Sequence, residues 1–317
     1  MKRYKIILLA LLGFSLPLLL ESCEKEETIE NTEWVLVWSD EFNIPTPDNR
    51  PDPLKWTYEL GASGYGNQEL QNYTDRVENA SYTIHEGLGC LKITALNDNY
   101  DGVAYSSARI KTEGLFEQRY GRFEARLKLP YGPGLWPAFW MLGANYDTNE
   151  WPGCGEIDIM EHRNAETQVI GTLHWNPSTT NYEHVYAGSE TTNSFGAIDT
   201  IENWHTYAIE WYEDCMKWYV DGICYQTMNI SSEQMDEFQR DHFIILNLAL
   251  GSNSSPFTLN QTVSANFTNA TMYVDYVRVF QGNDASFSIK NKKEGIAQPE
   301  TTTNRFSSMT SINNDGN

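Results

Sequence analysis

Positive charge is scarce in this chain. Of its 317 residues, 22 are Lys or Arg and 43 are Asp or Glu, so the formal net charge is −21 at pH 7. An electrostatic field of that sign repels nucleic acids and polyanionic substrates. The composition therefore argues against both kinds of partner and suits a neutral polymer.

Long hydrophobic runs are missing as well. The longest apolar run, residues 6–20, is broken by Gly13 and Pro17 and is too short for a membrane-spanning helix. It follows a basic stretch at residues 1–5, an order that is typical of an export signal. We therefore expect residues 1–22 to be a signal peptide.

The signal ends in Leu-Glu-Ser-Cys, which resembles a bacterial lipoprotein cleavage box with Cys23 as the lipid-bearing residue. Glu21 departs from the small residue usual there, and an ordinary signal peptide with a coincidental cysteine is the alternative. The acidic stretch 24–27 is similar to the surface-display tag of gut-type Bacteroidetes lipoproteins. This predicts a protein anchored to the outer membrane, at the cell surface, through an acidic linker at residues 23–32.

Cysteines are few, five in all, and their spacing matches no zinc or redox pattern. Apart from Cys23, there remain Cys90, Cys154, Cys215 and Cys224, which allow three disulfide pairings in an exported protein. The pairing stays open, because small buried hydrophobic side chains are an equally good interpretation.

Helical periodicity is almost absent. From Trp34 the chain alternates apolar and polar residues in short segments separated by turn signals, as half-buried antiparallel strands do. Examples are residues 91–95, 121–127, 206–211 and 272–280. Residues 217–220 and 223–225 flank Asp221-Gly222 and predict a hairpin with a tight primed turn. Only residues 231–240 look helical, with Ser231 or Ser232 as a cap.

These segments predict an all-β fold, a β-sandwich of the jelly-roll kind, in one domain at residues 33–282. The sequence contains no internal repeat. Residues 283–317 are rich in Ser, Thr, Asn and Lys without periodicity, so we expect a disordered polar tail.

The segment Gly-Glu-Ile-Asp-Ile-Met-Glu-His carries three acids. In a strand, Glu156 and Asp158 lie on one face, whereas strict alternation would bury Glu161 on the core side at a high cost. One extra residue at Ile159 or Met160, a β-bulge, returns Glu161 to the face of the other two acids. The sequence therefore predicts three acids in a row on one bulged strand.

Such a row suits a retaining glycosidase, whose two carboxyl groups lie about 5–5.5 Å apart. One carboxylate must be ionised to attack the anomeric carbon, and the other must be protonated to release the leaving sugar. Neighbouring acids raise one another's pKa, which keeps one of them protonated near neutral pH. Taken alone, three acids are equally compatible with an acidic strand edge that faces solvent or calcium.

Six further motifs follow one another along the chain. They are Trp-Ser-Asp-Glu-Phe at 38–42, Gly-Asn-Gln-Glu-Leu-Gln at 66–71, Ser-Ala-Arg-Ile at 107–110, Gly-Leu-Trp-Pro-Ala-Phe-Trp-Met-Leu at 134–142, Trp-His-Thr-Tyr at 204–207 and Val-Asp-Tyr-Val-Arg-Val at 274–279. Together with the three-acid segment they resemble glycoside hydrolase family 16, in its bulged, laminarinase-like branch, over most of residues 34–281.

The resemblance implies a concanavalin A-like jelly roll whose concave face forms an open sugar-binding cleft. It implies Glu156 as the nucleophile, Glu161 as the general acid/base, and Asp158 as the residue that orients the nucleophile. Catalysis in this family needs no cofactor.

The resemblance also implies substrate-binding residues: Asn67, Arg109, Trp136, Trp140, Trp151 and His174. Asn67 and Arg109 match positions that hydrogen-bond glucosyl units on the non-reducing side, and the tryptophans match sugar platforms. His174 falls on the next predicted strand, beside the acid/base. The alternatives are core packing for one tryptophan, Trp140 first, an ion pair for Arg109, and a structural role for His174.

Many family members hold one calcium ion away from the cleft. The matching positions are Glu41, Gly89 and Asp275, mostly through backbone carbonyls plus the aspartate carboxylate, and oxygen ligands suit calcium. One loop departs from the family pattern. Residues 251–258 lack the Trp of the usual Gly-Gly-x-Trp stretch, which bears on fine specificity.

The expected function is a retaining endo-β-glucanase. The expected partner is a neutral β-glucan polysaccharide, and we expect a monomer. The substrate implied is β-1,3-glucan of the laminarin type. The alternatives are a mixed-linkage β-1,3/1,4-glucan endohydrolase, a β-galactosyl-polymer or mucin O-glycan endohydrolase, and a non-catalytic glycan-binding lipoprotein.

Overall fold

The computed structural model describes residues 33–178, 182–190 and 201–282. The expected signal peptide, Cys23, the linker up to residue 32 and the tail from residue 283 lie outside the described residues. Within the described part, no helix is both long and apolar enough to cross a membrane.

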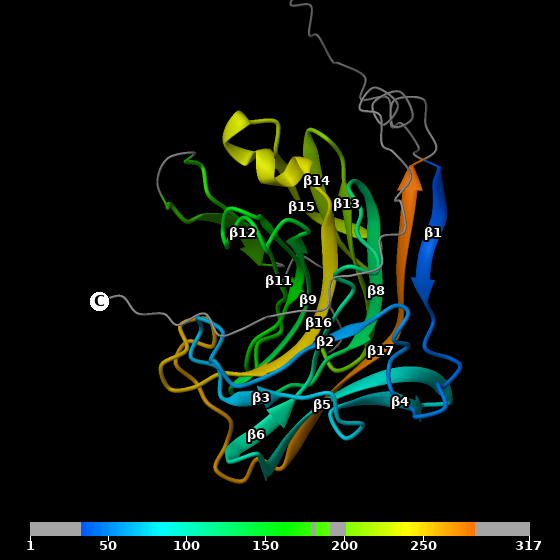
Figure 1. The fold of residues 1–317 in the computed structure, drawn as a ribbon, viewed down its shortest axis with the longest axis vertical. Helices are drawn as coiled ribbons and strands as arrows, with labels where there is room; N and C mark the ends of the chain where they lie inside the picture. Colours follow the sequence, from blue (N-terminus) through cyan, green and yellow to red (C-terminus); the bar gives the residue numbers. More distant parts are fainter. Residues whose placement is uncertain (1–32, 179–181, 191–200, 283–317) are drawn as a thin grey trace, which may run out of the picture. The chain divides into compact units, whose positions relative to one another are not determined.

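Most of the described chain forms two β-sheets (Figure 1). The larger sheet has ten strands in the order β15-β14-β13-β8-β17-β5-β6-β3, with β1 paired to β17 and β4 paired to β5. Its strands are β1 (Trp34–Asp40), β3 (Gln71–Tyr73), β4 (Ala80–His85), β5 (Leu88–Tyr100), β6 (Val103–Ser107), β8 (Gly121–Lys128), β13 (Trp204–Trp211), β14 (Cys215–Val220), β15 (Ile223–Asn229) and β17 (Asn269–Gly282).

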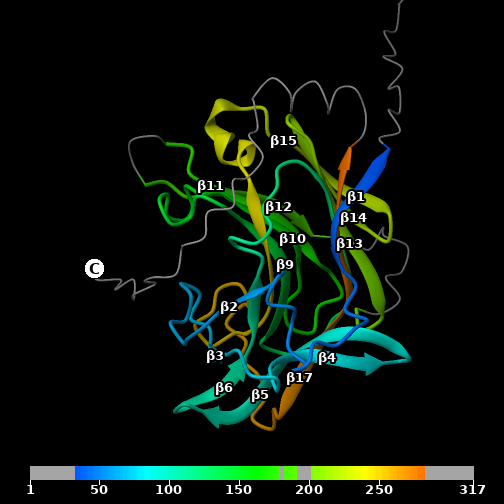
Figure 2. The ribbon, with the colours of Figure 1, turned by 45° about the vertical axis from the view of Figure 1, so that its right-hand side comes forward.

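The second sheet has seven strands in the order β12-β11-β10-β9-β16-β7-β2, all antiparallel. They are β2 (Thr57–Glu59), β7 (Arg109–Lys111), β9 (Leu135–Gly143), β10 (Glu156–Glu161), β11 (Ile170–Trp175), β12 (Val185–Glu190) and β16 (His242–Leu250). Figure 2 shows β9, β10 and β12 in one layer and β13, β14 and β17 in the layer beside it.

The main hydrophobic core lies between these sheets. Along β8, buried Phe123, Ala125 and Leu127 alternate with partly exposed residues, the period of a half-buried strand. From the other sheet, Ile157 and Ile159 of β10 join the same core. The predicted all-β sandwich of the jelly-roll kind is confirmed.

The predicted hairpin is also present. Strands β14 and β15 pair around Asp221 and Gly222, whose φ angles of 49° and 78° are both positive, as a primed turn requires. Cys215 lies opposite Asn229 and Cys224 opposite Tyr219, so these two thiols are at different ends of the hairpin. All four cysteines in the described ranges are free.

The predicted helix is a 3₁₀ helix, η1 (Glu233–Gln239), and not an α-helix. Ser232 caps it, since its side chain accepts a hydrogen bond from the backbone N–H of Gln234. Met235 has non-helical backbone angles, which interrupt the helix after its first residues. The cap was predictable from the sequence, whereas the tighter helix type was not.

Candidate active site

The three acids lie on the face of the seven-stranded sheet that is turned away from the main core, called the catalytic face below. Ile157, Ile159 and Met160 of the same strand belong to the core. Because the side chains of a strand alternate between its two faces, Glu156 and Asp158 must point the other way. The catalytic face therefore carries these two acids on β10.

A register shift brings Glu161 to the same face. Along β9, Trp140 pairs with Asp158 and the next residue, Phe139, pairs with Met160, so one residue of β10 is skipped at Ile159. The pairing with β11 shifts over the same stretch, between Asp158 and Glu161. An extra residue at this place is what the sequence required for three acids on one side.

The strand begins at a backbone position that suits glycine. Gly155 has a φ of +84°, and a Cβ there would lie 2.8 Å from the Cβ of Glu237. A larger residue would meet both backbone strain and a steric clash. Gly155 thus lets the chain turn into β10 directly before Glu156.

Glu156 is held by an indole and an imidazole. The indole N–H of Trp151 donates to Glu156 Oε2 at 3.0 Å, and His174 Nε2 lies 3.6 Å from Oε1. Burial, followed by the charge of Asp158, raises the pKa of Glu156 to about 8, while His174, Arg109 and the Trp151 hydrogen bond act to lower it. Three groups therefore favour the ionised form of this carboxyl.

Asp158 lies deeper, with only 2% of its surface exposed. Its Oδ2 atom is buried without a hydrogen-bond partner and lies 3.2 Å from His174 Nε2. Burial holds the pKa of Asp158 well above its usual range. The indole N–H of Trp218 on β14 donates to the backbone carbonyl of Asp158 at 2.8 Å, so the ten-stranded sheet fixes this point of β10.

Glu161 has a different set of neighbours. The indole N–H of Trp136 donates to Glu161 Oε1 at 3.0 Å. Burial raises the pKa of Glu161 well above its usual range, and the charges of Asp158 and Glu156 raise it further. Since two carboxylates oppose its ionisation, Glu161 keeps its proton when Glu156 has lost one.

The two glutamates therefore differ in their electrostatic surroundings. Those of Glu156 include three groups that favour its charged form, and those of Glu161 include two carboxylates that favour its protonated form. Asp158 lies between them in the strand and presents a carboxyl within 4.8 Å of donor atoms of both Glu156 and His174. That spacing would also suit a metal ion, but Trp151 and His184 already bond Glu156 and His174, so we assign the cluster to acid–base chemistry.

His174 is placed differently from the prediction. It was expected beside Glu161, but the register of β11 sets it opposite Glu156, and Glu161 instead pairs with Ile170. The register of the two strands sets this pairing at Glu156, before the bulge, and the bulge moves the pairing of Glu161 by only one residue. The structure adds a second imidazole that the sequence did not point to: His184 Nε2 lies 2.9 Å from His174 Nδ1.

Arg109 and Trp140 lie against each other on the catalytic face. The guanidinium of Arg109 sits 4.6 Å from the centre of the Trp140 ring and 5.2 Å from that of Tyr65. Its Nε lies 3.5 Å from Glu59, so the ion pair weighed as an alternative for Arg109 is present. The Trp140 indole donates to Asn247 Oδ1 at 2.7 Å.

The remaining predicted substrate residues are at different distances from the acids. Trp151 and Trp136 contact Glu156 and Glu161 directly, through the hydrogen bonds given above. Asn67 lies in an exposed turn, where its backbone N–H donates to Gly64, and its side chain bonds the buried carboxyl of Glu69. The structure thus brings Trp136 and Trp151, but not Asn67, into contact with the two glutamates of β10.

The divergent loop at residues 251–258 reaches the same site. Phe257 stacks on Trp136, with ring centres 4.2 Å apart and planes inclined by 20°. The guanidinium of Arg163 lies over Phe257, 5.5 Å from the centre of its ring. An aromatic side chain of the loop therefore supports the tryptophan that bonds Glu161.

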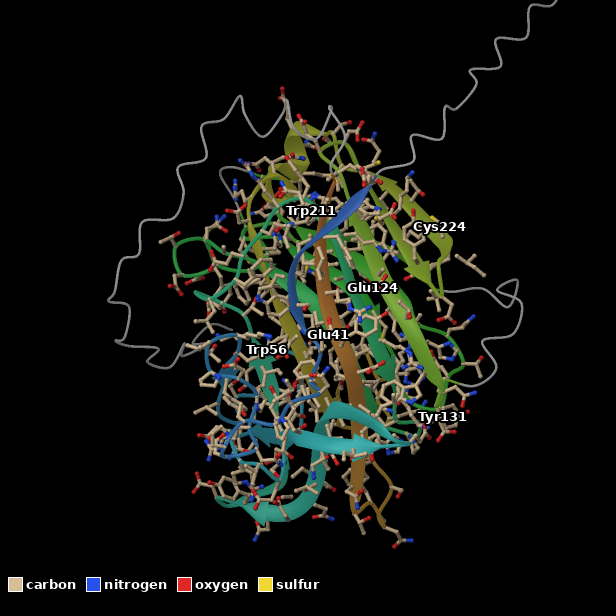
Figure 3. All side chains as sticks on the ribbon, turned by 90° about the vertical axis from the view of Figure 1, so that its right-hand side faces the viewer. Glu41, Trp56, Glu124, Tyr131, Trp211 and Cys224 are labelled. Carbon is tan, nitrogen blue, oxygen red and sulfur yellow. The ribbon has the colours of Figure 1, made fainter. Side chains whose placement is uncertain are left out.

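The predicted calcium positions converge elsewhere. Strand β5 pairs with the first half of β17, and β1 pairs with the second half along the same edge. Glu41, Gly89 and Asp275 lie at the junction of these two pairings. Figure 3 shows Glu41 beside β17, the orange strand. Glu41 is paired with Arg278 and Asp275 with Arg126. Both carboxylates at this junction are therefore engaged by arginines.

Comparison with known proteins agrees with this geometry. The model of glycosyl hydrolases family 16 matches residues 63–278. A "Beta-glucanase" of Rhodothermus marinus is 37% identical over 292 residues, which cover 89% of this chain and 95% of the relative. A "Glucan endo-1,3-beta-glucosidase" of Cryptopygus antarcticus is 36% identical and covers 86% of this chain and 99% of its own.

Solved structures give the same result. The X-ray structure of the laminarinase from Rhodothermus marinus superposes with a TM-score of 0.68 at 36% sequence identity. The match covers 80% of this chain and all of that one.

Proposed function

This chain belongs to glycoside hydrolase family 16, and from that membership we propose that it is a retaining endo-β-glucanase acting on β-1,3-glucan. The observation that carries the proposal is the unequal pair on β10. Glu156 has three neighbours that favour its charge, whereas Glu161 faces two carboxylates that oppose its ionisation. A retaining glycosidase needs one carboxyl in each state.

The reaction proceeds in two displacements. Glu156 attacks the anomeric carbon, and Glu161 donates its proton to the departing glycosidic oxygen, so a covalent glycosyl-enzyme and a shortened chain are formed. Glu161, now a carboxylate, takes a proton from water as the water oxygen attacks the same carbon. The second product leaves, Glu156 is a carboxylate again, and Glu161 is protonated again.

Asp158 and His174 support the first displacement. Asp158 is the neighbour of Glu156 on the same face of β10 and acts on its pKa through its charge, and we assign it the role of orienting the nucleophile. His174, opposite Glu156 in the register, favours the charged form of the nucleophile. Trp218, which anchors the Asp158 carbonyl from β14, keeps the middle of the strand in place.

We assign the enzyme to the laminarinase-like branch of the family. The support is the extra residue on β10 together with relatives named for β-glucan and 1,3-β-glucan. Aromatic rings beside both glutamates, Trp151 and Trp136, suit the apolar faces of glucosyl rings. A neutral glucan also suits the net charge of −21.

A mixed-linkage β-1,3/1,4-glucan is the second candidate. The observation that favours it is the 251–258 loop, which departs from the family pattern and yet contacts Trp136 through Phe257. Sizing of the products from laminarin, barley glucan, agarose and gastric mucin separates the candidates. We expect internal cleavage of laminarin, with or without barley glucan. Activity confined to agarose or mucin contradicts the glucan assignment, and no activity on any of the four contradicts an enzyme.

We also propose a calcium ion at the junction of β1, β5 and β17, held by backbone oxygens near Glu41 and Gly89 and by Asp275. The ion would join three strands and take no part in hydrolysis. Free calcium at about 100 times its dissociation constant stabilises the folded protein by about 2.7 kcal/mol, which raises Tm by about 5–10 °C. An unchanged Tm after chelation and calcium addition, with Asp275→Asn as the matched variant, contradicts the site.

Finally, we propose that the protein is exported and anchored to the outer membrane by a lipid on Cys23, facing the cell exterior. The support is the sequence pattern alone, a short apolar run followed by Leu-Glu-Ser-Cys and an acidic stretch. Outside the cell, the enzyme can cut a polysaccharide that is too large to be taken up.

A further inference from the structure

Two imidazoles share a hydrogen bond next to the nucleophile. His174 Nδ1 and His184 Nε2 are 2.9 Å apart, and the two rings are nearly parallel, with centres 5.1 Å apart. His184 precedes β12 and is exposed to solvent. The Trp151 ring packs 4.5 Å from it, so the indole that bonds Glu156 also contacts His184.

The shared bond forces the two rings into different states. Between two ring nitrogens, one must carry the proton and the other must accept it. His174 is the better donor, because its Nε2 lies 3.2 Å from Asp158 and 3.6 Å from Glu156, two groups that favour an imidazolium. His184 is then the neutral acceptor, and burial together with the charge of His174 lowers its pKa.

The other charged and titratable groups around this pair are few. Glu156, Asp158 and Glu161 face it from β10, and Arg109 acts on Glu156 from β7. Tyr186 on β12 stacks on His174 and is tilted against His184, and Tyr225 on β15 interacts with Asp158 and Glu161. Arg109 is a fixed cation and the tyrosines are neutral at the pH of catalysis. Within this set, Glu156 is the carboxyl that responds to the imidazole pair, because His174 acts to lower its pKa.

We propose that His184 is a positioning residue for the nucleophile: by accepting the Nδ1 proton of His174, it keeps His174 a cationic donor toward Glu156 and Asp158. This rests on the proposed function, in which Glu156 must be ionised to attack. Without this acceptor, the Nδ1–H of His174 loses its hydrogen bond to His184, and the cationic form of His174 becomes less stable. The nucleophile then ionises only at higher pH, so His184 sets the acidic limit of activity.

Two substitutions of His184 distinguish this role from a steric one. Gln places its terminal oxygen near the position of the imidazole Nε2, so His184→Gln keeps the acceptor, whereas His184→Leu keeps the bulk and removes it. His85→Leu is a matched control, because His85 stacks on Tyr273 in the other sheet. Both positions, His184 and His85, are at least partly exposed, so each variant should fold, which a Tm measurement checks.

The pH dependence of kcat/KM on laminarin or barley glucan is the test. For His184→Leu we expect the acidic limb to move up by about one pH unit, the effect of losing a neighbouring opposite charge. His184→Gln and His85→Leu should follow the wild type. An unmoved limb in His184→Leu, a changed KM alone, or an equal shift in His184→Gln overturns the proposal.

A second measurement does not depend on turnover. Nitrogen NMR of the labelled imidazoles reports the pKa of His174 directly, and we expect it to fall in His184→Leu and to hold in His184→Gln. An identical His174 pKa in the wild type and His184→Leu contradicts the proposal. If instead the wild type cleaves no glucan while this NMR shift is present, the proposed function fails and the imidazole pair stands.

Discussion

At the scale of single residues, the two glutamates of β10 differ in their neighbours more than in their burial. Glu156 accepts from Trp151 and faces His174, whereas Glu161 accepts from Trp136 and faces two carboxylates. The pKa of Glu156 is raised to about 8 and that of Glu161 well above its usual range. Because the two environments differ, the two carboxyls can hold different charges at one pH.

Replacement of either glutamate should abolish turnover without unfolding the protein. Glu156→Gln removes the nucleophile, and Glu161→Gln removes the proton donor, a loss of about 10²–10⁴-fold for the acid–base step alone. Azide should restore activity to Glu161→Ala and yield a β-glycosyl azide, since the glycosyl-enzyme still forms. Circular dichroism and Tm provide the folding control. An α-glycosyl azide, or rescue of the Glu156 variant in its place, reverses the two roles.

Trp136 offers a test of how Glu161 is tuned. Trp136→Phe keeps an aromatic ring on Phe257 but removes the indole N–H that stabilises the Glu161 carboxylate. The pKa of Glu161 therefore rises, and the basic limb of the pH profile should move up by about one unit, equivalent to about 1.4 kcal/mol. The pH dependence of kcat/KM measures this, with Phe257→Leu as a control that leaves the N–H in place. A basic limb that moves down contradicts the assignment of Glu161 as the acid.

At the scale of secondary structure, β10 depends on its first backbone position. Gly155 has a φ of +84° and no room for a Cβ beside Glu237, whereas Gly222 has a φ of +78° and nothing within 4 Å. Both Gly→Ala changes incur the cost of left-handed backbone, about 1–2 kcal/mol. Gly155→Ala also adds a clash, so we expect it to lose about 1–3 kcal/mol more in urea unfolding and to lose activity. Equal losses in the two variants, with full activity, rule out this role for Gly155.

Features contained in one segment were predictable from the sequence. The three acids, the need for one extra residue near Ile159 and the turn at Asp221 all follow from local alternation and turn chemistry. Features that depend on register between strands were not. Alternation along residues 171–175 does not say which residue of β10 His174 faces, and the contact of His174 with His184 joins β11 to the segment before β12.

Long-range partners were the hardest to predict. The pairing of Arg109 with Glu59 links β7 to β2, and Trp218 reaches the Asp158 carbonyl from the other sheet, 60 residues along the chain. Nothing in the composition of either segment indicates its partner. The folded arrangement alone brings these side chains to the catalytic strand.

At the scale of the whole molecule, the two sheets have different roles. The seven-stranded sheet carries the acids, and the ten-stranded sheet closes the core beneath them and supplies Trp218 to β10. The proposed calcium lies at the edge of β17 in the ten-stranded sheet, so its removal should reduce stability before it reduces the rate. The proposed lipid lies on Cys23, ahead of the described domain.

The anchor can be tested apart from catalysis. If Cys23 carries the lipid, Cys23→Ala should move the protein from the membrane fraction to the soluble one and leave its specific activity unchanged. Protease added to whole cells should cut the wild type. A mature N-terminus at another residue, found by peptide mass spectrometry, contradicts the lipidation.

The central claim is that Glu156 and Glu161 act by two displacements on a β-glucan. Proton NMR of the first reducing ends released from laminarin, recorded before mutarotation, tests it most directly. The account predicts that the β-anomer appears first and that the α-anomer follows by mutarotation. An α-anomer as the first product would mean a single displacement by water, and the assignment of Glu156 as a covalent nucleophile would be wrong.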